Sequence, residues 1–379
     1  MKCIHLSDLH IGKRVNEFSM LEDQKYILNE ILEVIDAEKP DGVFIAGDVY
    51  DRTVPSAEAV QLFDGFIAGL AERKLRTFII SGNHDSPERL AFGSKIMDDS
   101  GIHFSPVYSG KVAPYVMKDE FGAVNIYMLP FIKPANVKRF YPEEEIDSYT
   151  DAVRVAVENM NVDTAERNII ITHQFVTGAS RSESEEISVG GTDNVDASVF
   201  DGFDYVALGH IHRPQNMGEK RIRYCGTPLK YSFSEAGHSK SVTVVELKEK
   251  GNLEVREVPL VPLRDMKEIK GQYRELTLKS FYENTSYPED YVHITLTDEE
   301  DVPDAVGKLR VIYKNLMKLD YDNTRTRNLG SIAGEADIES KSPLQLFGEF
   351  YEGQNGRDMS DKQLEYMSEL IENVWEVEK

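Results

Sequence analysis

Five short stretches decide the fold of this chain: SDLH (7–10), GDVYD (47–51), GNHD (82–85), THQ (172–174) and GHIH (209–212). Each stretch directly follows a short apolar run of the kind that forms a strand. We expect these strands at Lys2–Ser7, Gly42–Ala46, Thr77–Ser81, Asn168–Thr172 and Asp204–Leu208. In an open α/β sheet the carboxyl ends of the strands face one crevice, so the five stretches should meet at a single site.

The segments between these strands carry apolar residues at the spacing of a helix. The pattern predicts helices over 20–38, 56–73 and 147–160, and a further strand over Asn125–Leu129. Alternating strands and helices indicate a layered α/β architecture. Near the end of this region, SVTVVELKEKGNLEVREVPL predicts a β-hairpin that turns at Lys250 and Gly251.

The remainder of the chain has a different pattern of predicted strands and helices. A strand at 291–296, a helix from about 303 and another strand predict a small α+β unit. The turn-rich linker TRTRNLGSIAGEADIESKS follows, and two amphipathic patterns, PLQLFGEFYEG and KQLEYMSELIENVWEVE, predict a pair of C-terminal helices. We therefore divide the chain into residues 1–265, 266–328 and 340–379.

Composition excludes several classes of protein. The 379 residues include no apolar run long enough for a transmembrane helix, and MKCIHLSDLH lacks the pattern of a signal peptide. Two cysteines, Cys3 and Cys225, lie in apolar surroundings, so we expect buried reduced thiols in a cytoplasmic protein; a disulfide is the weaker alternative. The formal net charge of -23 argues against a chain that binds nucleic acid unaided.

The five stretches share side chains that bind metal ions. These candidate ligands are Asp8, His10, Asp48, Asn83, His173, His210 and His212. All offer oxygen or imidazole nitrogen, a donor set that suits Mn²⁺, iron, Zn²⁺ or Mg²⁺. Seven donors are too many for one tetrahedral ion and suit two ions that share a carboxylate. The two-residue spacing of Asp8 and His10 would turn both side chains the same way if that segment is extended.

Each stretch taken alone has a simpler explanation. A single D-x-H or G-H-x-H is more often a capped strand end or a hydrogen-bonded core histidine, and GNHD alone suits an Asx-turn. The conjunction favours a site, because six of the nine histidines fall in or next to the five stretches.

Together the stretches resemble the calcineurin-like metallophosphoesterase family over about residues 1–230. The resemblance implies a metallophosphoesterase β-sandwich flanked by helices. It rests on SDLHIGK, GDVYDRTVPS, SGNHDSPERL, ALGHIHRPQ and RYCGTPLKYSFSE. The last of these, at 223–235, is typical of the DNA exonucleases of the family and not of its phosphatases at large.

The resemblance also assigns roles to the residues. It implies that Asp8, His10, Asp48 and His212 hold one ion, and that Asp48 bridges to a second ion held by Asn83, His173 and His210. The family's usual nuclease cofactor is Mn²⁺. His84 stands at the position of the family's catalytic histidine, and Asp51 at that of an aspartate that orients it in phosphatases. We therefore expect an Asp51 carboxylate that stabilises the His84 imidazolium.

The implied function is a metal-dependent double-strand exonuclease and hairpin endonuclease, which acts in DNA repair, recombination and replication. The resemblance implies a coiled-coil ATPase partner of the ABC class, a homodimer within a heterotetramer and no membrane. Residues 266–328 would then form a capping domain that positions DNA, and 340–379 would dock on the ATPase. The alternatives are a metallophosphatase of small-molecule or protein phosphoesters and, from another class, a DNA-tethering scaffold. Thr53 argues against the protein phosphatases, because it replaces the last glycine of their GDxVDRG motif.

Overall fold

The computed structural model describes residues 1–185, 193–327, 342–355 and 357–376. It forms two compact units, Met1–Asp265 and Met266–Lys379. No helix among the described residues is long and apolar enough to cross a membrane. Most of the predicted linker before the C-terminal helices, from residue 328 to residue 341, lies outside the described residues.

The first unit is built on two six-stranded sheets. The first sheet has the order β16-β15-β1-β4-β5-β6, in which β1, β4, β5 and β6 run parallel. At one edge β15 pairs antiparallel with β1, and β16 pairs antiparallel with β15. Its strands are β1 (Lys2–Leu6), β4 (Gly42–Ala46), β5 (Arg76–Ile80), β6 (Ile102–Phe104), β15 (Ser241–Leu247) and β16 (Leu253–Pro259).

The second sheet has the order β13-β14-β12-β9-β8-β7. Its four central strands are parallel, and an antiparallel strand closes each edge. The strands are β7 (Tyr115–Asp119), β8 (Gly122–Leu129), β9 (Arg167–His173), β12 (Tyr205–Gly209), β13 (Gln215–Met217) and β14 (Glu219–Tyr224). Both sheets therefore contribute parallel strand ends, which is the arrangement that collects loops at one edge.

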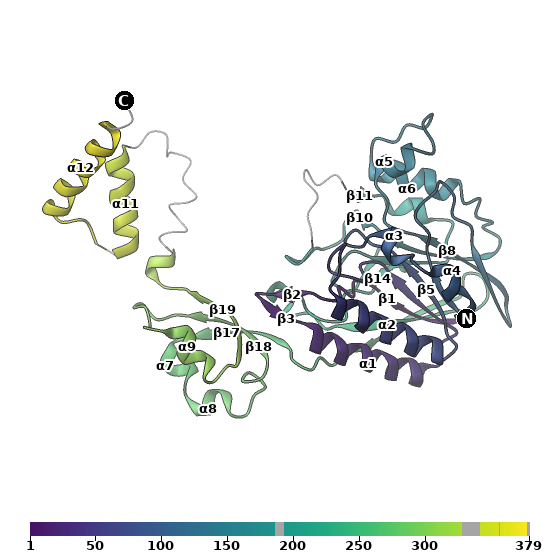
Figure 1. Ribbon diagram of the computed structural model, residues 1–379, viewed down its shortest axis with the longest axis horizontal. Helices are drawn as coiled ribbons and strands as arrows, with labels where there is room; N and C mark the ends of the chain where they lie inside the picture. The colour runs from purple at the N-terminus through teal and green to yellow at the C-terminus, as the bar shows by residue number, and fades with distance from the viewer. Residues whose placement is uncertain (186–192, 328–341, 356, 377–379) are drawn as a thin grey trace. The chain divides into compact units, whose positions relative to one another are not determined.

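Successive side chains along each strand point to opposite faces of the sheet. Phe44 and Phe78 of the first sheet pack against Ile169, Ile171 and residues near them in the second, so the central core lies between the sheets. The neighbouring residue Ile170 faces the other way, toward α5 (Pro134–Lys138) and α6 (Tyr149–Glu158). The helices α1 (Leu21–Glu38) and α2 (Ala57–Glu72) lie side by side along the sandwich (Figure 1). The predicted β-sandwich flanked by helices is confirmed.

The first unit also contains shorter elements. They are β2 (Arg14–Val15), β3 (Phe18–Ser19), α3 (Pro87–Leu90), α4 (Ser94–Met97), β10 (Phe175–Val176) and β11 (Asn194–Val195). Cys3 and Cys225 are both buried and free, as the sequence predicts. Burial raises the pKa of both thiols, which keeps them protonated.

The second unit contains a three-stranded parallel sheet of order β17-β18-β19. Its elements are β17 (Met266–Gly271), α7 (Tyr273–Leu276), α8 (Lys279–Tyr282), β18 (Tyr291–Leu296), α9 (Ala305–Arg310) and β19 (Asn315–Tyr321). Leu276, Ile294 and Leu309 belong to its own small core. The C-terminal helices are α11 (Pro343–Asn355) and α12 (Asp361–Glu376), which contact each other.

Candidate metal centre

The five predicted stretches do meet, but they come from two sheets and not from one open sheet. SDLH, GDVYD and GNHD follow β1, β4 and β5 of the first sheet, whereas THQ and GHIH lie at the ends of β9 and β12 of the second. Parallel strands in both sheets end at the same edge of the sandwich. The site is therefore built where two sheets face each other, which brings ligands from both sides.

The backbone at this edge does not follow the strand geometry that the spacing suggested. Asp8, His10 and Asp48 have φ angles of 52°, 44° and 47°, and His210 has a φ of 107°. The prediction that Asp8 and His10 align on an extended segment is therefore wrong, because left-handed turns aim these side chains. The amides of Asp8 and His10 donate to the carbonyls of Gly47 and Asp48, which holds the turns in place. Strained backbone that surrounding structure over-determines is typical of functional sites.

Two glycines are needed for close packing at this edge. A Cβ on Gly209 would lie 1.8 Å from the carbonyl oxygen of Ala46 and 2.7 Å from Nδ1 of His173. A Cβ on Gly82 would lie 2.1 Å from Oδ1 of Asp48. The main chain thus passes so close to the predicted ligands that no side chain fits at either position.

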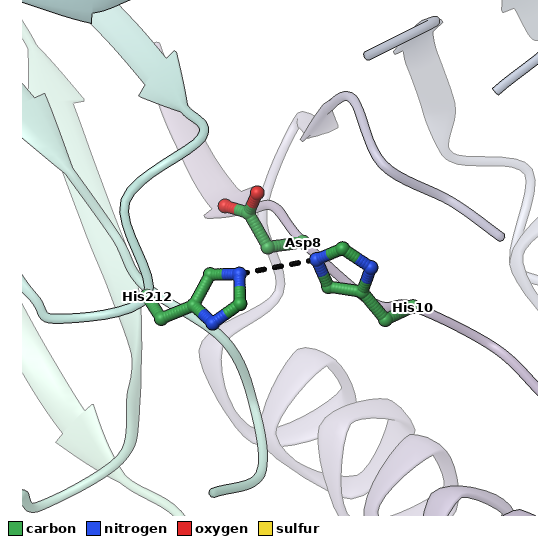
Figure 2. A group of neighbouring side chains, drawn as sticks. All are labelled: Asp8, His10 and His212. Atoms are coloured by element: carbon green, nitrogen blue, oxygen red, sulfur yellow. Dashed lines mark hydrogen bonds between the residues drawn. The ribbon is translucent and has the colours of Figure 1, made fainter. Parts of the chain in front are cut away.

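One group of ligand-type side chains consists of Asp8, His10 and His212, whose donor atoms lie within 4.8 Å of one another. Figure 2 shows the two imidazole rings with a nitrogen of each turned toward the other and Asp8 beside them. Nε2 of His10 and Nε2 of His212 are 3.1 Å apart, and Nε2 of His10 is 3.7 Å from Oδ2 of Asp48. All of these side chains are buried. We call them, with Asp48, the first half-site.

The second half-site consists of Asp48, Asn83, His173 and His210. Oδ1 of Asn83 lies 2.9 Å from Nε2 of His173 and 3.0 Å from Nδ1 of His210. Nε2 of His173 is 3.4 Å from Oδ2 of Asp48. Asp48 therefore lies close to histidines of both groups, as the predicted bridging carboxylate requires.

The charges at this site fit divalent cations. Burial lowers the pKa of His10 well below its usual range and that of His210 to about 3, so both imidazoles are neutral and can donate a lone pair. Burial raises the pKa of Asp8 to about 6. Burial also favours a neutral Asp48, but His173 and His10 outweigh it and hold the Asp48 pKa well below its usual range. Burial would lower the pKa of His173, yet the Asp48 carboxylate raises it to about 9.

This pattern means that Asp48 stays ionised in a buried place and attracts positive charge. Among the described residues, Nε2 of His210 and Nδ1 of His10 have no hydrogen-bond partner. Imidazole, carboxylate and amide oxygen without any thiolate form the donor set expected for two divalent ions of the Mn²⁺ or Zn²⁺ type. The residues therefore fit the implied metal centre.

His84 lies at the rim of the site, and its surroundings correct one expectation. The group of Asp51 that contacts His84 is its backbone carbonyl and not its carboxylate. Nδ1 of His84 lies 3.0 Å from that carbonyl oxygen. The carboxylate of Asp51 instead forms an ion pair with Lys13 at 2.8 Å and lies 3.8 Å from Nδ1 of His10. The predicted carboxylate contact to His84 is thus replaced by a main-chain contact. A carbonyl only accepts hydrogen bonds, so Nδ1 carries a proton and Nε2 faces Asp48, 4.0 Å away.

Several side chains that support this edge were not predicted from the sequence. The amide of Gln24, on α1, donates to the carbonyl of His10 at 2.8 Å and to the hydroxyl of Tyr231 at 2.9 Å, and Gln24 also accepts from the amide of Gly12. The carboxylate of Asp85 accepts from the backbone amides of Val49, Tyr50 and Gly82. The contacts of Gln24 with Tyr231 and of Asp85 with Val49 and Tyr50 join residues far apart in sequence, so only the fold reveals them.

The comparisons with known proteins agree with this geometry. The model of the calcineurin-like phosphoesterase family matches residues 1–214. The chain therefore belongs to the calcineurin-like phosphoesterases, the class that the sandwich and its histidine- and aspartate-lined edge define.

A second family model, described as the type 5 capsule protein repressor C-terminal domain, matches residues 262–355. A curated relative, the D subunit of the nuclease SbcCD from Staphylococcus epidermidis, is 32% identical over 378 residues, which cover 98% of each chain. Within its class, the chain is thus a member of the family of SbcCD D subunits.

The solved structures that the chain resembles are more distant. A dimetal phosphatase from Danio rerio is 12% identical with a TM-score of 0.41, and the match covers 69% of this chain and 98% of that one. Protein TT1561 of Thermus thermophilus is 11% identical with a TM-score of 0.36, and the match covers 68% of this chain and 98% of that one.

Proposed function

We propose that this chain is the metal-dependent nuclease subunit of an SbcCD-type complex for DNA repair and recombination, and that it hydrolyses phosphodiester bonds in double-stranded DNA. The observation that carries the proposal is the arrangement of seven ligand-type side chains in two half-sites around Asp48. The relationship over 98% of the chain to a nuclease subunit supports DNA as the substrate. Exonuclease action on duplex ends and endonuclease action on hairpins are the reactions we propose.

The two half-sites would hold two divalent ions, which we propose to be Mn²⁺. Asp8, His10, Asp48 and His212 would hold one ion, and Asp48, Asn83, His173 and His210 the other. When bound, two such ions lower the pKa of water and neutralise the charge of a phosphodiester. The buried carboxylate of Asp48 is shared, so neither half-site is complete without it.

His84 is the residue that we propose to handle a proton at the leaving oxygen. The carbonyl of Asp51 fixes the Nδ1–H of His84, which leaves Nε2 on the side of Asp48 and the predicted ligands. The amide of His84 also donates to Oδ1 of Asp48 at 2.9 Å, which ties its position to the metal site. With a second proton on Nε2, the resulting imidazolium can donate that proton to the leaving oxygen as a general acid.

The surface of the first unit explains why we propose a partner for DNA binding. Three basic residues near the ligand stretches in sequence are paired with acids: Lys13 with Asp51, Arg221 with Glu219 and Asp201, and Arg223 with Glu257. These cations are largely neutralised, in a chain whose formal net charge is -23. A coiled-coil ATPase of the SbcC type would supply additional positive surface.

The second unit supplies the proposed docking and positioning elements. We propose that residues 266–328 position DNA and that α11 and α12 bind the ATPase. The side chains of Phe350, Tyr366 and Leu370 on these helices are 49%, 65% and 43% exposed. Apolar residues on a helix pair of this length are suited to a groove or helix of a partner.

We propose a homodimer within a heterotetramer. The support is an exposed apolar pair in the first unit: Phe92, between α3 and α4, is 84% exposed, and Ile96 on α4 is 81% exposed. Large apolar side chains at the surface gain stability when a partner chain covers them, so both are candidates for an interface between copies. We also propose a cytoplasmic location, which the two free buried thiols support.

The deciding experiment incubates the purified chain with Mn²⁺ and either linear duplex DNA or p-nitrophenyl phosphate, with and without an SbcC-type partner and ATP. We expect degradation of the duplex that is lost in His84→Gln and kept in Asp36→Asn, a change at an exposed surface acid. Hydrolysis of the small ester alone, under all conditions, would contradict the nuclease proposal and support a phosphatase.

A further inference from the structure

A chain of partly buried polar contacts leads away from His212 on the side opposite to His10. Nδ1 of His212 lies 2.7 Å from Oγ of Ser184. The hydroxyl of Ser184 in turn donates to Oε1 of Glu235 at 2.5 Å. A serine hydroxyl has one proton, and an ionised carboxylate only accepts. The Ser184 proton therefore points to Glu235, and its oxygen accepts from Nδ1–H of His212.

This direction of donation fixes which ring nitrogen has a lone pair. With the proton on Nδ1, Nε2 is the ring nitrogen that can present a lone pair, and Nε2 is the atom that lies 3.1 Å from Nε2 of His10 (Figure 2). The ring thus presents its lone pair to the first half-site. Partners of this kind commonly set the tautomer and orientation of histidines that bind metals.

Glu235 is itself held in place. Its side chain is fully buried, and its Oε2 lies 2.5 Å from Nζ of Lys240. Nζ of Lys240 also donates to the backbone carbonyl of His212 at 2.9 Å and to the hydroxyl of Thr227 at 2.6 Å. The buried lysine keeps the carboxylate ionised and connects it a second time to residue 212.

The segment that contains Ser184 also contacts the main chain of His212. Oε1 of Glu185 accepts the backbone amide of His212 at 2.6 Å. Glu185 is fixed by the amide of Ser182 at 2.7 Å. Residues 182–185 therefore hold both the ring and the main chain of His212. If Glu235 served only as the ion-pair partner of Lys240, these contacts to His212 would not be required.

We propose that Ser184 and Glu235 are positioning residues that set the Nδ1–H tautomer and the ring orientation of His212, and so prepare Nε2 to bind an ion. The inference deepens the proposed function, since it takes His212 as a metal ligand. It also gives a physical role to the YSFSE part of RYCGTPLKYSFSE, because Tyr231 donates its amide to Glu235 and its hydroxyl to the carbonyl of Leu9.

The test uses the full chain and two measurements that do not depend on nuclease activity. Long-range ¹H–¹⁵N spectra of histidine-labelled protein without metal report the tautomer of His212, assigned with a His212→Gln variant. Calorimetric titration with Mn²⁺ alone reports ion binding. Ser184→Ala is the main variant, Ser184→Thr restores the hydroxyl, and Ser180→Ala is the control, since Ser180 is exposed and its hydrogen bonds to Gln215 involve only the backbone.

We expect the spectra of Ser184→Ala to show that the His212 ring is no longer in the Nδ1–H tautomer alone. Binding of one Mn²⁺ should weaken roughly 10- to 100-fold. Ser184→Thr and Ser180→Ala should match the unmodified chain in both measurements. Unchanged tautomer and unchanged Mn²⁺ binding in Ser184→Ala would overturn the proposal.

Glu235→Gln would leave Lys240 buried without its partner and is at risk of not folding. The double variant Glu235→Gln with Lys240→Met removes that charge and serves as the second test. It should fold and show the same weakened Mn²⁺ binding as Ser184→Ala, whereas full Mn²⁺ binding would overturn the role of Glu235. If the unmodified chain binds Mn²⁺ but cleaves no DNA, the proposed function fails while these results still decide the positioning role.

Discussion

The two half-sites are held by different means. In the first half-site, side chains from distant parts of the sequence support the ligands: Gln24 holds the carbonyl of His10, and Ser184 with Glu235 backs the ring of His212. In the second half-site the main chain provides the support. Nδ1 of His173 lies 2.8 Å from the carbonyl oxygen of Ala46, and the backbone at Gly209 passes next to that contact.

The difference shows which substitutions each half-site tolerates. A half-site supported by side chains can lose one hydrogen bond at a time and weaken in steps. A half-site supported by close main-chain packing has no room for an added methyl group, so it should fail abruptly. Asp48 is shared by both and should affect both together.

The largest effect is expected for Gly209→Ala, which breaks the packing of the second half-site. The added Cβ would lie 1.8 Å from the carbonyl oxygen of Ala46, a distance that no rotamer relieves. We expect the free energy of unfolding to fall by about 3 kcal/mol, with loss of metal binding. Thermal denaturation and metal content measure both. Gly237→Ala is the matched control, since nothing lies within 4 Å of its Cβ position, and equal melting temperatures for the two variants would contradict the packing argument.

Asp48→Asn tests the residue that the half-sites share. The variant keeps the shape of the side chain and removes the charge that lies near His10, His84 and His173. We expect both ions to be lost and the rate of phosphodiester hydrolysis to fall about 10³-fold or more, because the metals provide several kcal/mol of transition-state stabilisation. Metal analysis after gel filtration provides the count of ions. Retention of two ions would refute the bridging role.

A smaller effect is expected for Gln24→Leu, which weakens the support of the first half-site. The variant removes hydrogen bonds to the carbonyl of His10, the hydroxyl of Tyr231 and the amide of Gly12. Unpaired buried polar groups cost about 1–3 kcal/mol, so the melting temperature should fall and Mn²⁺ binding should weaken about tenfold. Gln61→Leu, at an exposed position of α2, is the control. Equal behaviour of the two variants would show that Gln24 does not support the site.

The smallest effect is expected for Asp51→Asn. Its backbone carbonyl, which contacts Nδ1 of His84, is unchanged by the substitution. The side chain loses its ion pair with Lys13 and the longer contacts, both 3.8 Å, with Arg52 and with Nδ1 of His10. We expect turnover within about threefold of the unmodified chain, because the group of Asp51 that contacts His84 is the backbone carbonyl, which the substitution leaves unchanged. Steady-state kinetics with full metal occupancy measures this. A loss of a hundredfold would restore the direct carboxylate role that the sequence suggested.

The strands, helices and donor types were predictable because each has a local signal. Apolar runs such as Gly42–Ala46 coincide with the strand that the structure contains, and the turn at Lys250 and Gly251 joins β15 and β16 as expected. The candidate ligands were recognisable because His and Asp recur directly after such runs. These features depend on neighbours in sequence, which a single chain displays.

The rest could not be predicted because it depends on contacts across the fold. Left-handed turns at Asp8 and His10 replace the extended segment that their spacing suggested, since hydrogen bonds to the loop after β4 decide the backbone. The contact of Ser184 with His212 spans 28 residues and that with Glu235 spans 51. The main-chain contact of Asp51 with His84 was missed for the same reason, because a side-chain motif does not show which backbone groups approach.

The most direct test of the account is the anomalous diffraction of crystals soaked in Mn²⁺. We expect two peaks about 3.5–4 Å apart, one on each side of the Asp48 carboxylate. The peak of the first half-site should be contacted by Asp8, His10 and His212, and that of the second by Asn83, His173 and His210. A single peak, or a peak that does not contact Asp48, would contradict the two-ion site on which the proposed hydrolysis of DNA depends.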